Sequence, residues 1–393
     1  MTVVALRRAE PGLLVIAPEG TPLVTDAAPA LDVMVLEVIG GHLSWDLFDG
    51  TDLPAAVLDD VAAAQDWVWA VYGEAVALAA DGIEQRTLTA TPARPGLLRA
   101  LRRLAYAHWA SRWWPASTVD GVPALDHRLL LEEIESLTGT CDMAVEVHND
   151  RAGLLVDEFH GIERVDDASS TETSDHDVGP SDDEVVPGGR PHGTADAHDD
   201  SAGRATDYAL AAGRPDQGDG LIIARGTGGW DWRRCPPGIL DASEHAVSWQ
   251  VTRAAGVSTV RISVVAAPDC RGVVPEHLRP LARVRSWRAQ PAVTEQGPSP
   301  SAAHDRARPL PTVDAEVPLH LRGDAWTAGI DIAGPPEIPL DITVFVPGVG
   351  PAAHVAQPDV QDRIRRFARL RLSASTDDRL SAEAAAADRD EDF

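Results

Sequence analysis

Residues 313–321 read VDAEVPLHL, so every second residue is apolar and the residues between them are acidic, proline or histidine. This period of two is typical of a β-strand that buries one face. Pro318 falls on the outward phase and has no amide proton to donate, which predicts that the strand lies at a sheet edge. Residues 340–346, LDITVFV, place apolar side chains at the same alternate positions. Together the two segments predict β-structure late in the chain.

A β-hairpin is predicted upstream of these strands, around a turn at residues 254–256. Apolar residues alternate with polar ones on both sides of that turn: Val247, Trp249 and Val251 before it, and Val260, Ile262 and Val264 after it. Residues 289–312 contain five prolines and few large apolar residues, so we expect them to form a mobile insertion. Residues 220–376 are therefore predicted to form a mainly-β, sandwich-like domain.

The N-terminal residues 1–162 are predicted to form an α+β domain. Short apolar runs predict strands at 13–17, 33–39 and 42–48, with Gly40-Gly41 as a turn, and closing strands at 143–147 and 154–156. Helical spacing predicts three helices: about 54–82 with Asp52 as a possible N-cap, Leu97 to before Pro115, and about 125–137 with a stop at Gly139.

Acidic side chains are unevenly distributed along the chain, whose formal net charge is −27. Residues 163–219 carry 15 acidic residues against 4 arginines and contain few large apolar residues, too few to offset the entropy of ordering. We therefore expect an acidic disordered linker there. Residues 1–162 are also acidic, residues 220–376 carry a net charge of +3, and residues 377–393 form an acidic tail.

The chain contains no lysine, so all 34 of its basic side chains are arginine. A Walker A phosphate loop, a pyridoxal or Schiff-base enzyme and a protein kinase each need a lysine. These enzyme classes are excluded, and no other recognisable catalytic signature is present. The sequence leaves enzymatic activity open, favours a non-enzymatic role and indicates no cofactor.

The cysteines Cys141, Cys235 and Cys270 are odd in number and widely spaced, which argues against a disulfide framework or a zinc site. The 13 histidines show no metal-ligand spacing, so no metal site is predicted. The N-terminal apolar run is too short for a secretion signal, and the longest apolar stretch, residues 53–80, contains four acidic residues. We expect a cytoplasmic protein without a membrane partner. Its oligomeric state is left open.

A thiol, an imidazole and a carboxylate occur close together in the sequence, at Cys141, His148 and Asp150. These groups are the ingredients of a thiol-dependent hydrolase, provided that the fold brings them together. The predicted strand at 143–147 would instead carry Cys141 and His148 about 20 Å apart. The hydrolase is therefore kept as an alternative.

Two further groups of residues are candidates for binding. Trp230 and Trp232, if exposed, could present flat faces to a protein or to a sugar ring. Residues 361–372 combine helical apolar spacing with many arginines, which predicts a basic helix that binds an acidic protein surface. Its candidate binding residues are Arg363, Arg365, Arg366 and Arg369.

The arginines of this helix have two other possible occupants. The acidic linker or tail could cover them from within the chain, because both are tethered at high effective concentration. Nucleic acid is disfavoured by the negative net charge.

These observations predict an interaction or adaptor protein that bridges partners through a net-acidic N-terminal domain and an Arg-rich β domain. The partner of the β domain is expected to have an acidic surface. Besides the hydrolase, a carbohydrate-binding β-sandwich that uses Trp230 and Trp232 remains an alternative function.

Overall fold

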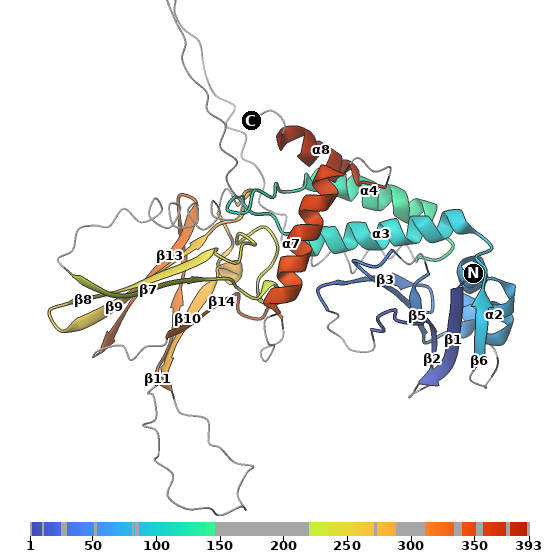
Figure 1. Ribbon diagram of the computed structural model, residues 1–393, viewed down its shortest axis with the longest axis horizontal. Coiled ribbons are helices and arrows are strands. Elements are labelled where there is room, and N and C mark those ends of the chain that lie inside the picture. The colour runs from blue at the N-terminus through green and yellow to red at the C-terminus, as the bar shows by residue number, and fades with distance from the viewer. Residues whose placement is uncertain are drawn as a thin grey trace, which may run out of the picture.

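The computed structural model describes residues 2–9, 12–24, 30–50, 53–80, 82, 86–145, 220–270, 273–287, 311–333, 340–350, 357–374 and 378–390. It contains an N-terminal α/β region and a C-terminal region of antiparallel sheets (Figure 1). The predicted linker at 163–219 and nearly all of the predicted insertion at 289–312 lie outside the described residues.

Six antiparallel strands form the N-terminal sheet, in the order β3-β4-β5-β2-β1-β6. Their bounds are β1 Thr2–Ala9, β2 Leu13–Pro18, β3 Val33–Val38, β4 Gly41–Asp46, β5 Ala55–Leu58 and β6 Arg86–Ala90. The strands predicted at 13–17, 33–39 and 42–48 are confirmed. Gly40 has a φ of +75°, and a Cβ there would collide with the carbonyl of Asp60, so the turn between β3 and β4 requires glycine.

Four helices accompany this sheet: α1 Val61–Tyr72, α2 Glu74–Ala80, α3 Pro95–Trp113 and α4 His127–Thr140. The prediction of one helix from 54 to 82 is wrong at its start, because Ala55–Leu58 is strand β5, paired with β2 and β4. It is also wrong in its middle, because Gly73 separates α1 from α2. All four residues of β5 are buried, so they lack the alternation of a strand with one solvent face. Asp60, and not Asp52, caps α1 by accepting a hydrogen bond from Ala63 N.

Helices α3 and α4 follow the sequence prediction closely. Helix α3 ends before Pro115 as expected, whereas α4 runs past Gly139 to Thr140. The strand predicted at 143–147 is not formed over its described part. Residues 141–145 turn back instead, with Ala144 N and Val145 N both donating to Cys141 O. The strand predicted at 154–156 lies outside the described residues.

Two antiparallel sheets make up the C-terminal region, one in the order β12-β13-β9-β8-β7 and one in the order β11-β10-β14. Their bounds are β7 Leu221–Gly228, β8 Val247–Ala254, β9 Val257–Val265, β10 Leu281–Trp287, β11 Pro311–Pro318, β12 His320–Arg322, β13 Ala325–Ala333 and β14 Leu340–Phe345. Strands β8 and β9 form the predicted hairpin. The face-to-face packing of a sandwich stays a prediction.

The segment 313–321 is divided between these two sheets. Strand β11 lies at the edge of the three-stranded sheet and β12 at the edge of the five-stranded sheet. Pro318 ends β11, so the predicted edge position is confirmed. Where the chain crosses, Leu319 is fully buried and its N donates to Pro280 O at 3.0 Å.

Two further α-helices, α7 Pro358–Ser373 and α8 Ser381–Asp390, and two short 3-10 helices, Trp232–Arg234 and Glu276–Leu278, complete the described structure. Helix α7 is the predicted basic helix, and α8 forms within the acidic tail. Figure 1 shows α7 crossing between the C-terminal sheets and α3, with α8 beside α4, which it contacts. The two regions are therefore in contact through these helices.

Candidate functional site

Arg365 of α7 lies at the centre of the contact between the two regions. Its side chain is only 4% exposed, and its Nε lies 3.8 Å from Oδ2 of Asp120, in the loop between α3 and α4. From the C-terminal region, the Ala242 carbonyl accepts from its Nη1 at 3.2 Å, and the Glu244 carboxylate lies 3.5 Å from its Nη2. The guanidinium also faces the ring of Trp232. Burial lowers the pKa of Arg365, and the carboxylates of Asp120, Glu244 and Asp362 oppose that shift.

Two other arginines of α7 also reach acidic residues of the N-terminal region. Arg363 Nη1 lies 3.7 Å from Asp32 Oδ2, and its guanidinium sits 4.2 Å from the ring centroid of Phe48. Arg369 Nη2 lies 3.8 Å from the other oxygen, Oδ1, of Asp120. Asp120 is thus shared by two arginines of one helix, which ties the loop before α4 to α7.

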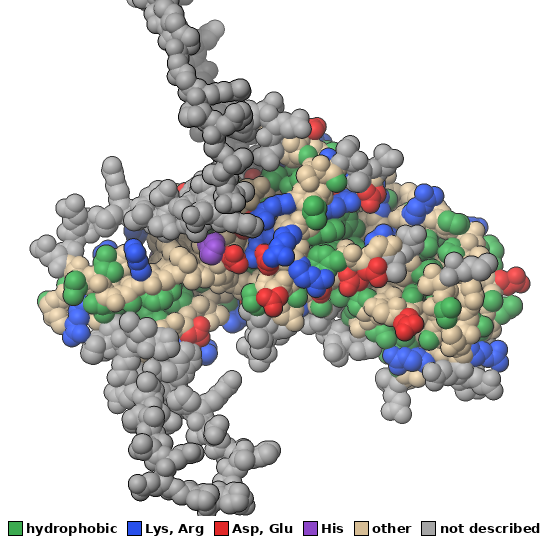
Figure 2. Space-filling view, in the orientation of Figure 1, with side chains coloured by type: hydrophobic (Ala, Val, Ile, Leu, Met, Phe, Trp, Pro, Cys, Tyr) green, Lys and Arg blue, Asp and Glu red, His purple; other side chains and the backbone are tan. Residues whose placement is uncertain are grey.

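The last of the four candidate arginines, Arg366, pairs with Asp362 one turn earlier on α7. All four arginines therefore have acidic partners within the chain. Figure 2 shows arginine and acidic side chains mixed over the middle of the molecule, where Figure 1 places α7. Among the described residues, acids of the N-terminal region supply most of the partners from outside the helix.

An aromatic cluster reinforces the ion pairs. The ring of Phe367 on α7 meets three rings of the N-terminal region edge-on: Phe48 at 5.8 Å, Tyr106 at 6.1 Å and Trp109 at 6.2 Å between centroids. Such edge-to-face pairs add stability beyond the buried area. Phe367 therefore packs α7 against α3 and against the segment that follows β4.

Glu383 of α8 is a buried hydrogen-bond acceptor within the same contact. It is fully buried and accepts hydrogen bonds from Tyr106 OH at 2.5 Å, from Arg371 Nη2 at 2.6 Å and from Leu380 N at 2.8 Å. Burial, and then the nearby Glu383 carboxylate, raises the pKa of Tyr106. An acid of the tail thus neutralises one arginine of α7, as the sequence allowed.

Asp241 joins the loop after α3 to the C-terminal region. Its fully buried carboxylate accepts from Ser117 Oγ at 2.7 Å, from Thr118 N at 2.7 Å and from Ser243 N at 2.9 Å. Burial raises the pKa of Asp241, while these donors act in the opposite direction. Because the donors come from both regions, this carboxylate stabilises their docked arrangement.

Trp230 and Trp232 are both buried, with 8% and 5% of their surface exposed. The indole Nε1 of Trp230 donates to Asp241 O at 2.6 Å. A flat exposed face for a sugar ring is therefore absent at these two residues. They line the junction that holds Arg365.

Cys141 is fully buried at the end of α4, and burial together with Asp142 raises the pKa of its thiol to about 11. A nucleophilic cysteine needs the opposite shift, toward the thiolate. His148 and Asp150, the other candidates for the hydrolase, lie outside the described residues. Of the predicted triad, the structure therefore describes Cys141 alone.

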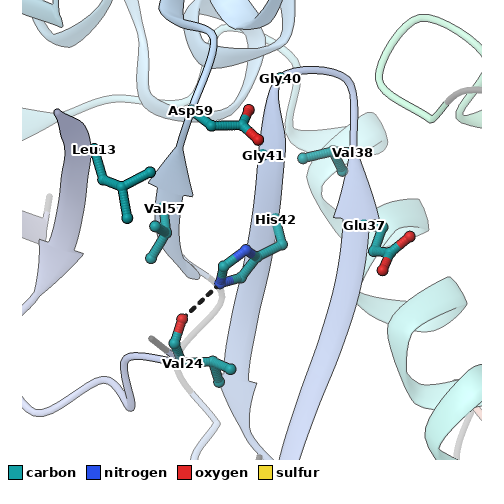
Figure 3. A pocket seen from close by; sticks show the side chains of 9 residues that line it. All are labelled: Leu13, Val24, Glu37, Val38, Gly40, Gly41, His42, Val57 and Asp59. Carbon is teal, nitrogen blue, oxygen red and sulfur yellow. Dashed lines mark hydrogen bonds between the residues drawn. The ribbon is translucent and has the colours of Figure 1, made fainter. Parts of the chain in front are cut away.

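A shallow hollow of about 420 Å³ lies on the N-terminal sheet, near the β3–β4 turn. Figure 3 shows His42 turned toward Val24, whose carbonyl lies 2.8 Å from Nε2, while Glu37 points away from the imidazole. The titratable groups of the hollow therefore do not converge on one point. Across the described ranges, no cluster of three or more His, Cys, Asp or Glu is arranged to hold a metal.

The five-stranded sheet carries arginines of a different kind. Arg225, Arg261 and Arg322 are exposed and make no ion pair, side-chain hydrogen bond or ring contact within the described structure. The arginines of α7 are engaged inside the chain, whereas these three have no such contact with the described residues. Sequence reasoning missed them because they are isolated in sequence, and only strand pairing aligns Arg225 with Arg261 across the sheet.

No family model matches the chain, and neither a curated protein nor a solved structure matches it. In the part of the chain that the structure describes, no helix is both long and apolar enough to cross a lipid bilayer.

Proposed function

We propose that this chain is a non-enzymatic adaptor that bridges two protein partners from a fixed arrangement of its two regions. One partner, with an acidic surface, binds the C-terminal sheets; the other, or a second copy of the chain, binds the N-terminal region. The observation that carries the proposal is the contrast between the engaged arginines of α7 and the unengaged Arg225, Arg261 and Arg322 of the five-stranded sheet.

In this proposal the arginines of α7 hold the adaptor together. Arg365 is too buried to meet a partner, and the pairs of Arg363 and Arg369 with Asp32 and Asp120 span the two regions. Removing them would disturb the relative position of the two binding surfaces. The acidic partner is therefore assigned to the sheet.

The proposal also covers the packing of the C-terminal sheets and the cellular location of the protein. We propose that the two C-terminal sheets pack face to face as a sandwich, which the contact of β11 with β13 supports. We also propose a cytoplasmic location, which suits three free and buried cysteines.

Crosslinking and affinity purification from the native cell, with mass spectrometry of the recovered proteins, tests the adaptor role. The wild-type chain is compared with Arg225→Glu/Arg261→Glu and with Arg128→Glu/Arg389→Glu, exposed positions on α4 and α8 that change the net charge equally. We expect the sheet variant alone to lose an acidic partner while other partners stay.

Two outcomes would count against the proposal. Recovery of no partner in stoichiometric amount would overturn the adaptor role. Retention of every partner by the sheet variant would overturn the assignment of the acidic partner to the sheet.

A further inference from the structure

Strand β7 is an edge strand of the five-stranded sheet, and among the described residues it pairs with β8 alone. Its outer edge therefore offers backbone N–H and C=O groups to an incoming strand. The strand begins with two exposed apolar residues, Leu221 at 72% and Ile222 at 54% exposure. Natural edge strands usually discourage pairing, whereas this one combines an open edge with apolar side chains.

The register of the sheet aligns polar side chains on its outer face. Arg225 of β7 lies opposite Gln250 of β8, which lies opposite Arg261 of β9. Neighbouring strands are about 4.8 Å apart, so the two arginines stand about 10 Å from each other along one row. Next to this row run the hydroxyls of Thr227, Ser248 and Ser263.

Among the described residues, one acidic side chain lies on this face. Asp331 of β13 shares the face and accepts a hydrogen bond from Thr259 Oγ1 at 2.6 Å. Arg225, Arg261 and Arg322 outnumber it, and no described carboxylate pairs with any of the three. The face is therefore complementary to a partner that carries carboxylates.

We propose that β7 binds an extended acidic segment of a partner protein by strand addition. The segment pairs with the open edge of β7, places a carboxylate beside Arg225, and places an apolar side chain beside Leu221, which lies on the opposite face of the strand because the register of β7 shifts between Ile222 and Ala224. Because side chains of a strand alternate, the ligand carries its acidic residues at every second position. This inference rests on the proposed adaptor role and names the site and the form of its acidic partner.

A protein segment fits this edge better than nucleic acid does. Nucleic-acid binding needs either many phosphate contacts or exposed rings for base stacking. The chain has a formal charge of −27, and the large ring of β8, Trp249, lies on the inner phase of its strand against Gly226. Backbone pairing along β7 is available to a peptide and not to a nucleic acid.

Fluorescence anisotropy with the full-length chain tests the site. The probe is a labelled decapeptide of alternating valine and glutamate, and three further probes act as comparisons: the valine–lysine analogue, the same acidic peptide with alternate backbone nitrogens methylated, and a ten-nucleotide single-stranded DNA. We expect saturable binding of the first peptide, and at least a roughly ten-fold weaker affinity for each of the other three.

Variants separate the edge from the rest of the sheet. Arg225→Glu should lower the affinity for the acidic peptide at least roughly ten-fold, because it replaces electrostatic attraction by repulsion. Arg253→Glu is the matched control, since Arg253 lies on the neighbouring strand but on the opposite phase. It should change the affinity less than about two-fold. Circular dichroism of both variants checks that the sheet is intact.

Three results would overturn strand addition: no saturable binding of the acidic peptide below roughly 1 mM, undiminished binding of the methylated peptide or of DNA, or equal effects of Arg225→Glu and Arg253→Glu. If the acidic peptide does not bind while recovery of a cellular partner still depends on Arg225, the adaptor role is supported and only strand addition is excluded.

Discussion

Arg365 and Asp120 face each other across the junction of the two regions, 3.8 Å apart between Nε and Oδ2, with only 4% and 7% of their side chains exposed. One comes from α7, near the end of the chain, and the other from the loop between α3 and α4. Removing either buried group leaves the other with only more exposed counter-charges: Arg369 for Asp120, and Glu244 and Asp362 for Arg365. This pair therefore makes the docking of α7 on the N-terminal region conditional on both residues.

Replacing Arg365 with methionine should destabilise the protein strongly. Methionine preserves much of the side-chain volume but removes the charge that faces Asp120, so we expect the free energy of unfolding to fall by about 3 kcal/mol. Urea denaturation, followed by tryptophan fluorescence, measures the change.

The neighbouring Arg366 provides the control. Its pair with Asp362 is formed on the same helix, but the arginine is 67% exposed. Arg366→Met should therefore cost less than about 1 kcal/mol. Equal losses for Arg365→Met and Arg366→Met would show that the buried pair has no special part in the docking.

Phe367→Ala should loosen α7 and α8 from the N-terminal region. The ring contacts Phe48, Tyr106 and Trp109, and because it is partly buried we expect a loss of about 2–4 kcal/mol. Hydrogen exchange should become faster in both helices and stay unchanged in β8 and β9. Phe367→Leu, which keeps an apolar side chain, should lose less than half as much. Unchanged exchange in α7 and α8 on alanine substitution would contradict the role of this anchor.

The C-terminal strands could be predicted from the sequence where a strict period of two adjoins a recognisable turn, as in Val247 to Val264. Strand β5 could not, because its four buried residues carry no alternation and adjoin the helical spacing of α1. Helix α7 was predictable from its spacing of Ile364 and Phe367.

The contacts of α7 were not predictable in the same way. Asp120 and Asp241 belong to no local pattern, and they meet Arg365 and Ser117 only when distant segments fold together. The arginines concentrated along residues 361–372 are therefore the ones that pair within the chain. Arg225 and Arg261 are far apart in sequence, and only strand register aligns them.

Gly226→Ala should destabilise the edge of the five-stranded sheet. A Cβ at this position would lie 2.6 Å from the ring of Trp249, so the indole or the strand must move. We expect a loss of about 1–3 kcal/mol and a shift in tryptophan emission. Gly228 lies on the same strand, and a Cβ there meets nothing within 4 Å. Gly228→Ala should therefore be close to neutral, and an equal loss at both glycines would point to backbone entropy and not to the packing of Trp249.

Stability should fall in alkaline solution through Cys141. Burial raises the pKa of its thiol to about 11 in the folded protein, above that of an exposed cysteine at about 8.5. Because its pKa is raised, the thiol stays protonated to a higher pH in the folded protein than in the unfolded chain. The stabilising contribution of the protonated thiol is therefore complete below the unfolded-state pKa and is lost as the pH rises through 11. The difference in the free energy of unfolding between wild type and Cys141→Ala should shrink by roughly 2–3 kcal/mol between pH 8 and 11.5.

Alkylation of the same thiol distinguishes this behaviour from that of a nucleophile. At pH 7.5 the buried Cys141 thiol is almost entirely protonated, so iodoacetamide should label it far more slowly in the native protein than after unfolding in urea. The variant Cys235→Ala/Cys270→Ala leaves Cys141 as the single thiol, which assigns the measured rate to it. Rapid labelling of the native variant at neutral pH would contradict a buried, protonated Cys141 and would return the thiol hydrolase to consideration, because an activated cysteine is ionised and accessible under those conditions.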